Sequence, residues 1–323
     1  MNQPGFERDV LAAPARFAAL LDAYADGGPL ADVPPRRSVL FLGIGSSRFA
    51  ALPAAARLRA AGLDAVADFA SSGVQSLPRP DVLAVGISAS GTTSETVEAL
   101  SRHRGIGPTV AITNDPTSLL AAVADVVLPL HAGVEEGEVS CLTFQATLAV
   151  LQLLGDRLLG AEPAGATLRP AVEAAMALRE GRDEWLPNLA SLVDEAVFVS
   201  LAAPAERLST ALQGALMLRE GPRVYASAAE AGDWPHVDVY LAKRPGYALL
   251  LSTGSPFDGQ ARDWCRGRGA RLAALGPALD GAEVRVPLPE DPVIRLLVEP
   301  GVLDLVAAEV WRRRIAAADS ALV

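Results

Sequence analysis

Cysteine and long apolar runs are scarce in this chain of 323 residues, and each scarcity excludes a class of protein. The two cysteines, Cys141 and Cys265, lie far apart, which gives no metal-binding spacing and fits a reducing compartment. No uncharged apolar run reaches the roughly twenty residues of a membrane span. The first residues, MNQPGFERDV, contain neither the basic nor the apolar segment of a secretion signal. We therefore expect a soluble, cytoplasmic protein that binds no metal.

Lysine is scarcer still, because Lys243 is the only one in the chain. The formal net charge of −10 argues against a nucleic-acid scaffold and a nucleic-acid partner, although an acidic protein can still hold an anion in a local pocket. Half of the residues are hydrophobic, which is enough for a large core. The length predicts one large domain or two of medium size.

Unbroken apolar segments alternate with helical patterns along the chain. In the first half these segments are residues 38–44, 81–87, 108–113 and 125–130. In the second half they include residues 195–201 and 247–253. Strands that are apolar throughout and alternate with helices are typical of parallel sheets covered on both faces. We predict an α/β fold of two similar units, produced by internal duplication.

The helical patterns set the expected boundaries. Long helices are predicted over residues 6–25, 138–160 and 167–192. We expect an N-terminal helix and linker at 1–36, a first domain at 37–165 and a second domain at 166–323.

Two hydroxyl-rich loops follow apolar segments and precede helices. They are VGISASGTTSET, residues 85–96, and GIGSSR, residues 43–48. The first amides of a helix lack internal partners and carry partial positive charge, so hydroxyls beside them can bind a phosphate without lysine. Loops at the carboxyl ends of neighbouring parallel strands share one crevice, so both loops can face one ligand. The alternative is that Thr92 or Ser94 only caps the following helix.

A dinucleotide site is a further alternative for GIGSSR. The loop has the first two glycines of a G-x-G-x-x-G motif, and Asp64 and Asp68 follow about twenty residues later. Arg48 occupies the third glycine position, where a side chain would obstruct close packing of helix on strand. A dinucleotide site would also leave the second hydroxyl loop without a role.

Taken in order, the motifs resemble the SIS (sugar isomerase) domain family, above all the tandem pair that forms the isomerase half of glucosamine-6-phosphate synthase. The motifs are GIGSS, GISASGTTSET, VAITNDPTSLLAAVAD, HAGVEEGEVSCLTFQATLAVLQLL and ALQGALMLRE. The resemblance covers nearly the whole chain after residue 36. It implies two SIS domains, each a parallel sheet between helix layers as in flavodoxin, and a sugar-phosphate ligand.

The resemblance also implies which residues bind that ligand. The phosphate would be held at Ser46, Ser47, Ser88, Ser90 and Thr93. Possible sugar contacts are Gly45, Glu138 and Ser140. The family commonly has a glutamine between the two serines of the second loop, where this chain has Ala89.

Two catalytic positions are carried over from the family. Glu220 matches the glutamate that moves a proton between C1 and C2, and His236 has the spacing of the ring-opening histidine. An aldose–ketose conversion needs such a carboxylate and imidazole. In the synthase the histidine comes from a neighbouring subunit, which implies a homodimer. Taken alone, Glu220 would be interpreted as a solvated end of a helix and His236 as a buried structural residue.

The remaining histidines and acids have less specific interpretations. His103 lies in the polar turn SRHRG and is expected at the surface. His131 follows a predicted strand, where it either lines the crevice or has a structural hydrogen bond. Glu135, Glu136 and Glu138 are interpreted first as a solvated acidic turn, although relatives bring this region near the sugar.

Departures from the family narrow the predicted reaction. Met217 and Leu142 replace two lysines, and the final segment RRRIAAADSALV lacks the tail that supplies the synthase with a Schiff-base lysine. Lys243 does not match that position, and an imine step needs an amine. With no glutaminase domain in front, we do not expect a complete glutamine-dependent synthase.

We predict an enzyme without a cofactor, an aldose–ketose isomerase of a sugar phosphate or amino-sugar phosphate. The alternatives are a deaminase or deglycase of an amino or glycated sugar phosphate, and a non-catalytic sensor.

Overall fold

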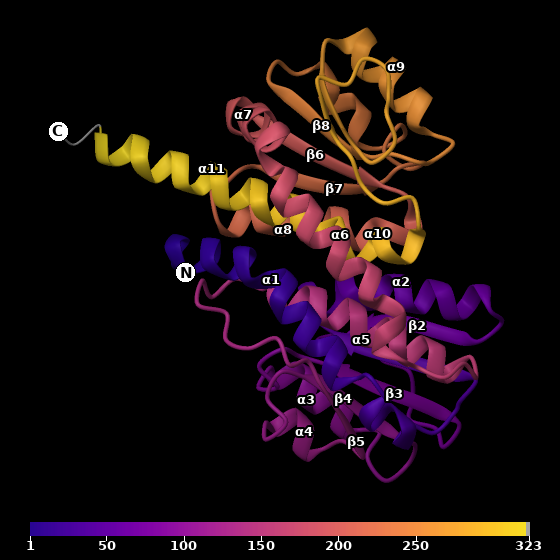
Figure 1. Ribbon diagram of the computed structural model, residues 1–323. Helices are drawn as coiled ribbons and strands as arrows, with labels where there is room; N and C mark the ends of the chain where they lie inside the picture. The colour runs from indigo at the N-terminus through magenta and orange to yellow at the C-terminus, as the bar shows by residue number, and fades with distance from the viewer. Residues whose placement is uncertain (321–323) are drawn as a thin grey trace. The chain divides into compact units, whose positions relative to one another are not determined.

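The computed structural model describes residues 1–320, and the last three residues of the C-terminal segment discussed above lie outside it. Two compact units are present (Figure 1). The first-sheet unit consists of residues 15–134 and 142–169. The second-sheet unit consists of residues 1–14, residues 135–141 and the chain from residue 170 onward. Each unit is therefore assembled from segments that are separated in the sequence.

The first-sheet unit contains a five-stranded parallel sheet in the order β2-β1-β3-β4-β5. Its strands are β1 (Ser38–Gly43), β2 (Asp64–Phe69), β3 (Val82–Ile87), β4 (Thr109–Thr113) and β5 (Val126–Pro129). Its helices are α2 (Ser46–Ala60), α3 (Ser94–Ser101), α4 (Leu119–Ala122) and α5 (Leu142–Leu158), with a short 3-10 helix, η1 (Gly28–Asp32), before β1 and another, η2 (Gly165–Leu168), after α5. The chain leaves β1 first towards β2 and then returns to β3 on the other side, so the carboxyl ends of β1 and β3 form the switch point of the sheet.

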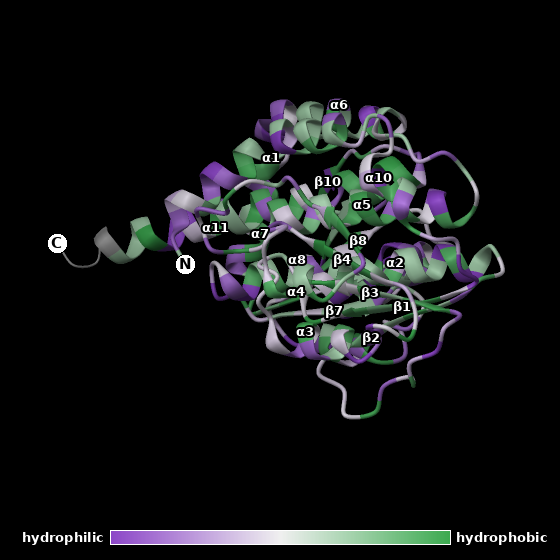
Figure 2. Cartoon of the chain, turned by 90° about the horizontal axis from the view of Figure 1, so that it is seen from below, coloured by the Kyte–Doolittle hydropathy of each residue, from purple (hydrophilic) through white to green (hydrophobic). Residues whose placement is uncertain are grey.

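Three of the four apolar segments predicted in the first half are the inner strands β1, β3 and β4 of this sheet, and the fourth is the edge strand β5. Every residue of β3 and β4 is buried, because helices cover both faces. In Figure 2 the strands are mostly in the hydrophobic colour, whereas α1 (Gln3–Ala23) and α6 (Arg169–Glu180) show a mixture of hydrophobic and hydrophilic colour. The edge strand β2 was not predicted, since its sequence DAVADF mixes buried and exposed positions and lacks the continuous apolar run of the others.

The second-sheet unit repeats the same topology in the order β10-β9-β8-β6-β7, with β6 flanked by β7 and β8. Its strands are β6 (Phe198–Ala203), β7 (Ala226–Glu230), β8 (Tyr247–Ser252), β9 (Arg271–Leu275) and β10 (Val284–Val286). Its helices include α7 (Leu186–Glu195), α8 (Leu208–Glu220), α9 (Asp258–Arg268), α10 (Pro292–Val298) and α11 (Pro300–Ser320). Short 3-10 helices are η3 (Gly181–Glu184), η4 (Ala205–Arg207) and η5 (Asp238–Lys243). The predicted duplicated α/β fold is thus confirmed.

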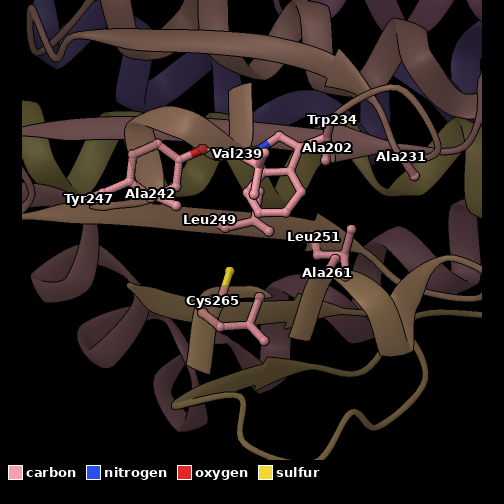
Figure 3. Close-up of a cluster of buried hydrophobic side chains, with 11 residues drawn as sticks. Ala202, Ala231, Trp234, Val239, Ala242, Tyr247, Leu249, Leu251, Ala261 and Cys265 are labelled. Atoms are coloured by element: carbon pink, nitrogen blue, oxygen red, sulfur yellow. Dashed lines mark hydrogen bonds between the residues drawn. The ribbon is translucent and has the colours of Figure 1, made fainter. Parts of the chain in front are cut away.

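A large buried cluster lies beside the second sheet (Figure 3). Trp234 is fully buried there, and its indole Nε1 donates a hydrogen bond of 2.9 Å to the hydroxyl of Tyr247. Cys265 of α9 belongs to the same cluster, and burial raises the pKa of its thiol to about 12. This cysteine therefore packs as a small apolar residue and is not a thiolate at neutral pH.

Two helix boundaries differ from the sequence prediction. The helix expected from residue 138 begins at Leu142, because Glu138 has a left-handed φ of 57° and residues 135–141 join the other unit. The helical stretch expected over 167–192 is divided into α6 and α7 by η3. Among residues 1–320 no helix is long and apolar enough to cross a membrane, and no group of three metal-ligating side chains converges.

Candidate functional site

Both hydroxyl loops lie at the carboxyl edge of the first sheet. GIGSS connects β1 to α2, and the loop from Ser88 to Thr93 connects β3 to α3. Because β1 and β3 are adjacent parallel strands, with Leu42 paired to Gly86, their carboxyl ends meet at the switch point. The sequence analysis placed the two loops at one edge, and the structure brings them there.

Within the second loop the hydroxyls bond to one another. Ser88 is buried, and its Oγ lies 2.9 Å from Oγ1 of Thr93 and accepts a hydrogen bond from the amide of Gly91. Ser90 Oγ lies 2.9 Å from Oγ1 of Thr92 and accepts from the Thr92 amide. The loop is therefore folded by its own hydroxyl groups.

The helix-capping alternative for this loop is wrong. The residue at the cap of α3 is Thr93, and its side chain makes no capping hydrogen bond. Thr92 is bonded to Ser90, and the Ser94 hydroxyl donates to the carboxylate of Glu95. The hydroxyls are thus not used to satisfy the start of the helix.

Glycine is required at position 91 for this loop to fit. Gly91 has a φ of 65°, and a Cβ there would lie 2.0 Å from the Ser118 Oγ and 2.8 Å from the Thr113 Oγ1. The neighbouring strand also holds the loop, since the Asn114 amide donates to the carbonyl of Ala89. Any larger residue at position 91 would push the loop away from β4.

The first loop presents Ser46 and Ser47 in the first turn of α2, both half-buried. Gly45 precedes them with a φ of 54°, and the space around it is open. Arg48 stacks its guanidinium 3.8 Å from the centre of the Phe69 ring, and its buried Nε has no hydrogen-bond partner among the described residues. The two loops together present uncharged hydroxyls at helix N-termini, an arrangement suited to a tetrahedral anion.

Glu220 and His236 both lie in the second-sheet unit, on different local structures. Glu220 is the last residue of α8 and is half-buried. Burial raises the pKa of its carboxyl, and the positive charges of Arg219 and Arg223 partly offset this. The following residue, Gly221, is packed so closely that a Cβ there would lie 2.9 Å from the Trp311 ring. Glu220 is therefore partly desolvated at a well-packed helix end.

His236 lies in an exposed turn between β7 and η5. Its amide donates to the carbonyl of Asp233 at 2.9 Å, and its imidazole has no hydrogen-bond partner among the described residues. The interpretation of His236 as a buried structural histidine is therefore wrong, and the imidazole is accessible.

The predicted sugar contacts are divided between the units: Gly45 belongs to the first-sheet unit, and Glu138 and Ser140 belong to the second. Glu138 is exposed and accepts a hydrogen bond of 2.6 Å from the amino terminus of Met1, which lowers the pKa of its carboxyl. The carbonyl of Ser140 accepts a hydrogen bond of 2.7 Å from Nε2 of Gln213, which ties this segment to α8.

Two histidine predictions can be compared with the structure. His103 was expected at the surface, but it is only 1% exposed. The turn after α3 packs against the chain before β3, since a Cβ on Gly107 would lie 2.5 Å from the carbonyl oxygen of Arg79. Burial, together with the charge of Arg102, lowers the pKa of its imidazole. His131 is exposed and has a left-handed φ of 49°, with its ring 6.2 Å from that of Tyr24 in an edge-on contact.

The sequence analysis missed a buried charged cluster at the carboxyl edge of the second sheet. Arg207 follows β6, and Arg295 and Glu299 lie on and after α10. The Glu299 Oε2 lies 3.3 Å from Arg207 Nε and 3.0 Å from Arg295 Nε, and all three side chains are at most 7% exposed. We call these three residues the arginine–glutamate cluster. Arg295 and Glu299 are an i,i+4 pair, but Arg207 lies about ninety residues earlier in the chain, so no local sequence pattern predicts the cluster.

A carboxylate also covers the loop after β8. Oδ2 of Asp258 accepts hydrogen bonds from the amides of Gly254 at 2.6 Å and Ser255 at 3.2 Å. These amides follow β8 as Ala89 and Ser90 follow β3, so a side chain of the protein lies where an anion could otherwise be bound.

One part of the chain matches a known protein family. Residues 34–156 match the SIS domain family, and this part of the chain is therefore a SIS domain. The chain is 28% identical over 256 residues to the glutamine–fructose-6-phosphate aminotransferase [isomerizing] of Caulobacter vibrioides, an alignment that covers 72% of this chain and 41% of that protein. The chain thus spans less than half of that relative.

Three solved structures have a similar fold. The C-terminal domain of glucosamine-fructose-6-phosphate aminotransferase from Francisella tularensis superimposes with a TM-score of 0.84 at 18% identity, covering 95% of this chain and 96% of that one. Tagatose-6-phosphate ketose/aldose isomerase from Escherichia coli gives 0.76 at 15% identity, covering 94% and 92%. Glucosamine-6-phosphate deaminase from Thermotoga maritima gives 0.75 at 18% identity, covering 96% and 95%.

Proposed function

We propose that this chain, which carries a SIS domain at residues 34–156, is an aldose–ketose isomerase of a sugar phosphate or an amino-sugar phosphate. The observation that carries the proposal is the pair of hydroxyl loops on adjacent strands, whose hydroxyls do not cap a helix. The phosphate would be bound by Ser46, Ser47, Ser88, Ser90 and Thr93. Binding would replace the hydroxyl–hydroxyl bonds of the loop with stronger bonds to a charged group.

Glu220 is the proposed base. It would take the proton from C2 of the open-chain aldose, leaving an enediol, and return it to C1. The hydroxyl at C2 then loses its proton and becomes the ketone, while the oxygen at C1 gains one. A carboxylate buried enough to have a raised pKa is a stronger base than an exposed one, which suits this proton transfer.

His236 is the proposed ring-opening group. Opening a pyranose breaks the bond between C1 and the ring oxygen, which gains a proton as the hydroxyl at C1 loses one. An accessible imidazole can donate the first proton and accept the second near neutral pH. In this proposal the chain works as a homodimer, with His236 delivered by the neighbouring copy.

Exposed apolar side chains support the proposed dimer. Val237 is 55% exposed and Tyr240 is 69% exposed, in the segment that contains His236. Tyr225, immediately before the edge strand β7, is 78% exposed. Large apolar side chains exposed to solvent are typical of a protein interface.

A second candidate reaction is deamination of an amino-sugar phosphate. Its support is the fold similarity to a glucosamine-6-phosphate deaminase and the single lysine, which lies exposed at the end of η5. A substrate that brings its own nitrogen needs no lysine to form an imine. Release of ammonia would identify this reaction.

The decisive experiment compares wild type with Glu220→Gln on fructose 6-phosphate, tagatose 6-phosphate and glucosamine 6-phosphate. Binding is read by thermal shift, because a ligand of the folded state raises the melting temperature. Turnover is read by mass spectrometry in D2O, where isomerisation leaves deuterium on carbon, together with an ammonia assay. Glu184→Gln, at an exposed position of the same unit, is the matched control.

We expect Glu220→Gln to abolish turnover while the affinity for the sugar phosphate changes by only a few-fold. Full activity of this variant would contradict the assignment of the base. Binding without turnover by the wild-type protein would identify a phosphosugar sensor instead.

A further inference from the structure

We infer that Trp234 and Asp238 are positioning residues that hold His236 in place from its two sides. The inference rests on the proposed function, in which His236 opens the sugar ring. Trp234 lies two residues before the histidine and Asp238 two residues after it. Both side chains are bonded to the sheet, whereas the imidazole between them is exposed and unbonded.

The anchor before His236 is the indole of Trp234. It is fully buried in the cluster of Figure 3, where its Nε1 points towards the hydroxyl of Tyr247 on β8. The Trp234 carbonyl accepts hydrogen bonds of 3.1 Å from the amides of Asp238 and Val239. The side chain thus ties the turn to β8, and the main chain ties its two ends together.

The anchor after His236 is the carboxylate of Asp238. Its Oδ2 accepts hydrogen bonds from Ser227 Oγ at 3.1 Å and Ser200 Oγ at 3.4 Å. Ser200 on β6 and Ser227 on β7 are direct register partners, and their hydroxyls lie 3.3 Å apart. The carboxylate therefore spans two neighbouring strands, and movement along either strand would break a bond.

Further bonds fix the main chain of the turn. The Glu230 Oε2 accepts from the amides of Gly232 and Asp233, and the His236 amide donates to Asp233. An exposed turn would otherwise lose considerable entropy when its histidine is placed against a substrate. A displacement of about 1 Å in a catalytic group can cost a hundred-fold in rate, so these anchors are a means of keeping kcat high.

The test compares Asp238→Ala and Trp234→Phe with a control in the same cluster, Cys265→Ala. Cys265 is 1% exposed and contributes packing, but it lies on α9 and makes no bond to the turn. Asp238→Ala is also made in a His236→Gln background. Each variant is assayed for kcat and KM with fructose 6-phosphate, tagatose 6-phosphate and glucosamine 6-phosphate, and for amide hydrogen exchange at residues 231–239.

We expect Asp238→Ala to lower kcat by about 10- to 100-fold with KM within about three-fold. Trp234→Phe keeps a smaller aromatic ring but loses the indole donor to Tyr247, and we expect kcat to fall by about three- to ten-fold. Both should speed exchange at residues 231–239, whereas Cys265→Ala should leave kcat and this exchange within about two-fold. In the His236→Gln background Asp238→Ala should lower kcat no further, because residues that act through one group are not additive.

If Asp238→Ala left hydrogen exchange at residues 231–239 unchanged, Asp238 would not anchor the turn, whatever the effect of the variant on kcat. A full kcat loss from Asp238→Ala in the His236→Gln background would overturn the action through His236. Faster exchange in Asp238→Ala, combined with a wild-type protein that turns over none of the three sugar phosphates, would support the anchor but overturn the proposed function and the catalytic role of the anchor.

Discussion

The two sheets have the same strand order, but the side chains at their carboxyl edges differ: uncharged hydroxyls at the first sheet and charged groups at the second. At the first sheet, the loops after β1 and β3 consist mainly of glycines and hydroxyl-bearing residues. Neither residues 43–47 nor residues 88–93 include a charged side chain. At the second sheet, the corresponding strands β6 and β8 end beside the arginine–glutamate cluster and the carboxylate of Asp258. The duplicated fold has thus placed loops after corresponding strands of the two sheets, with hydroxyls in one unit and charged side chains in the other.

The difference shows that one unit of a duplicated fold can present groups suited to binding an anion while side chains of the protein occupy the equivalent position in the other unit. A buried charge that loses its partner destabilises the fold, so removing one member of the arginine–glutamate cluster should lower the stability of the protein. Hydroxyls that bond to each other exchange partners at little cost, because they are neutral. The first edge is therefore suited to an incoming anion, and the second edge is closed by side chains of the protein.

The largest expected effect comes from breaking the second edge. Glu299→Gln removes the carboxylate that Arg295 pairs with and leaves Arg207 with the exposed Glu206, 3.7 Å away. We expect it to lower the free energy of unfolding by about 3–5 kcal/mol. Urea unfolding followed by tryptophan fluorescence measures this unit specifically, since all four tryptophans lie in it. A loss below about 1 kcal/mol would show that the cluster is solvated or that another group takes the charge.

The next prediction concerns a buried acid, Asp304 on α11, in the same unit. Burial, with a contribution from Glu135, raises the pKa of Asp304 to about 8 from an ordinary value of 3.8. Between these values the native state holds a proton that the unfolded state has released. Stability must therefore fall as the pH rises towards 8 and become independent of this group above it, with a slope of at most about 1.4 kcal/mol per pH unit.

Asp304→Asn should flatten that slope and make the protein more stable than wild type at pH 8. Urea unfolding at pH 5, 6, 7 and 8 measures the effect. Asp183→Asn, whose side chain is 90% exposed, is the control and should leave the slope unchanged. A wild-type protein whose stability does not fall over this range would contradict the protonated state of Asp304.

A smaller effect is expected from the first edge. Ser88→Ala and Thr93→Ala each remove one member of the 2.9 Å hydroxyl pair, and each should weaken fructose 6-phosphate binding by about ten-fold. Stability should change by less than about 1 kcal/mol, because no charge loses its partner. Isothermal titration calorimetry measures the affinity, with Ser101→Ala on α3 as control. Unchanged affinity in both variants would remove these hydroxyls from the ligand site.

The smallest expected effect concerns the charge around Glu220. The positive charge of Arg223 holds down the raised pKa of that carboxyl, so Arg223→Gln should move the acidic limb of the kcat/KM profile to higher pH. Because Arg223 is exposed and screened by salt, a shift of less than about one pH unit is expected. Arg244→Gln, at another exposed position, should leave the limb in place. A shift to lower pH would contradict the sign of the interaction.

The sequence predicted the inner strands and the hydroxyl loops well for a local reason. A strand buried on both faces must be apolar along its whole length, so its sequence is easily identified. The loop that follows it is then the next segment of the chain. The edge strand β2 escaped because half of its side chains are exposed. The burial of His103 also escaped, since its polar neighbours in SRHRG indicate a surface turn although the imidazole points inward.

The sequence by itself determined that this chain forms two α/β units and that hydroxyl loops follow two strands of the first. Periodicity and residue type are local properties, and they are sufficient for these conclusions. Only the tertiary structure decided that the hydroxyls of Ser88 and Thr93 bond to each other and do not cap α3, and that Arg207 meets Glu299. Such pairings depend on which distant segments fold against each other and on the high cost of leaving a buried charge alone.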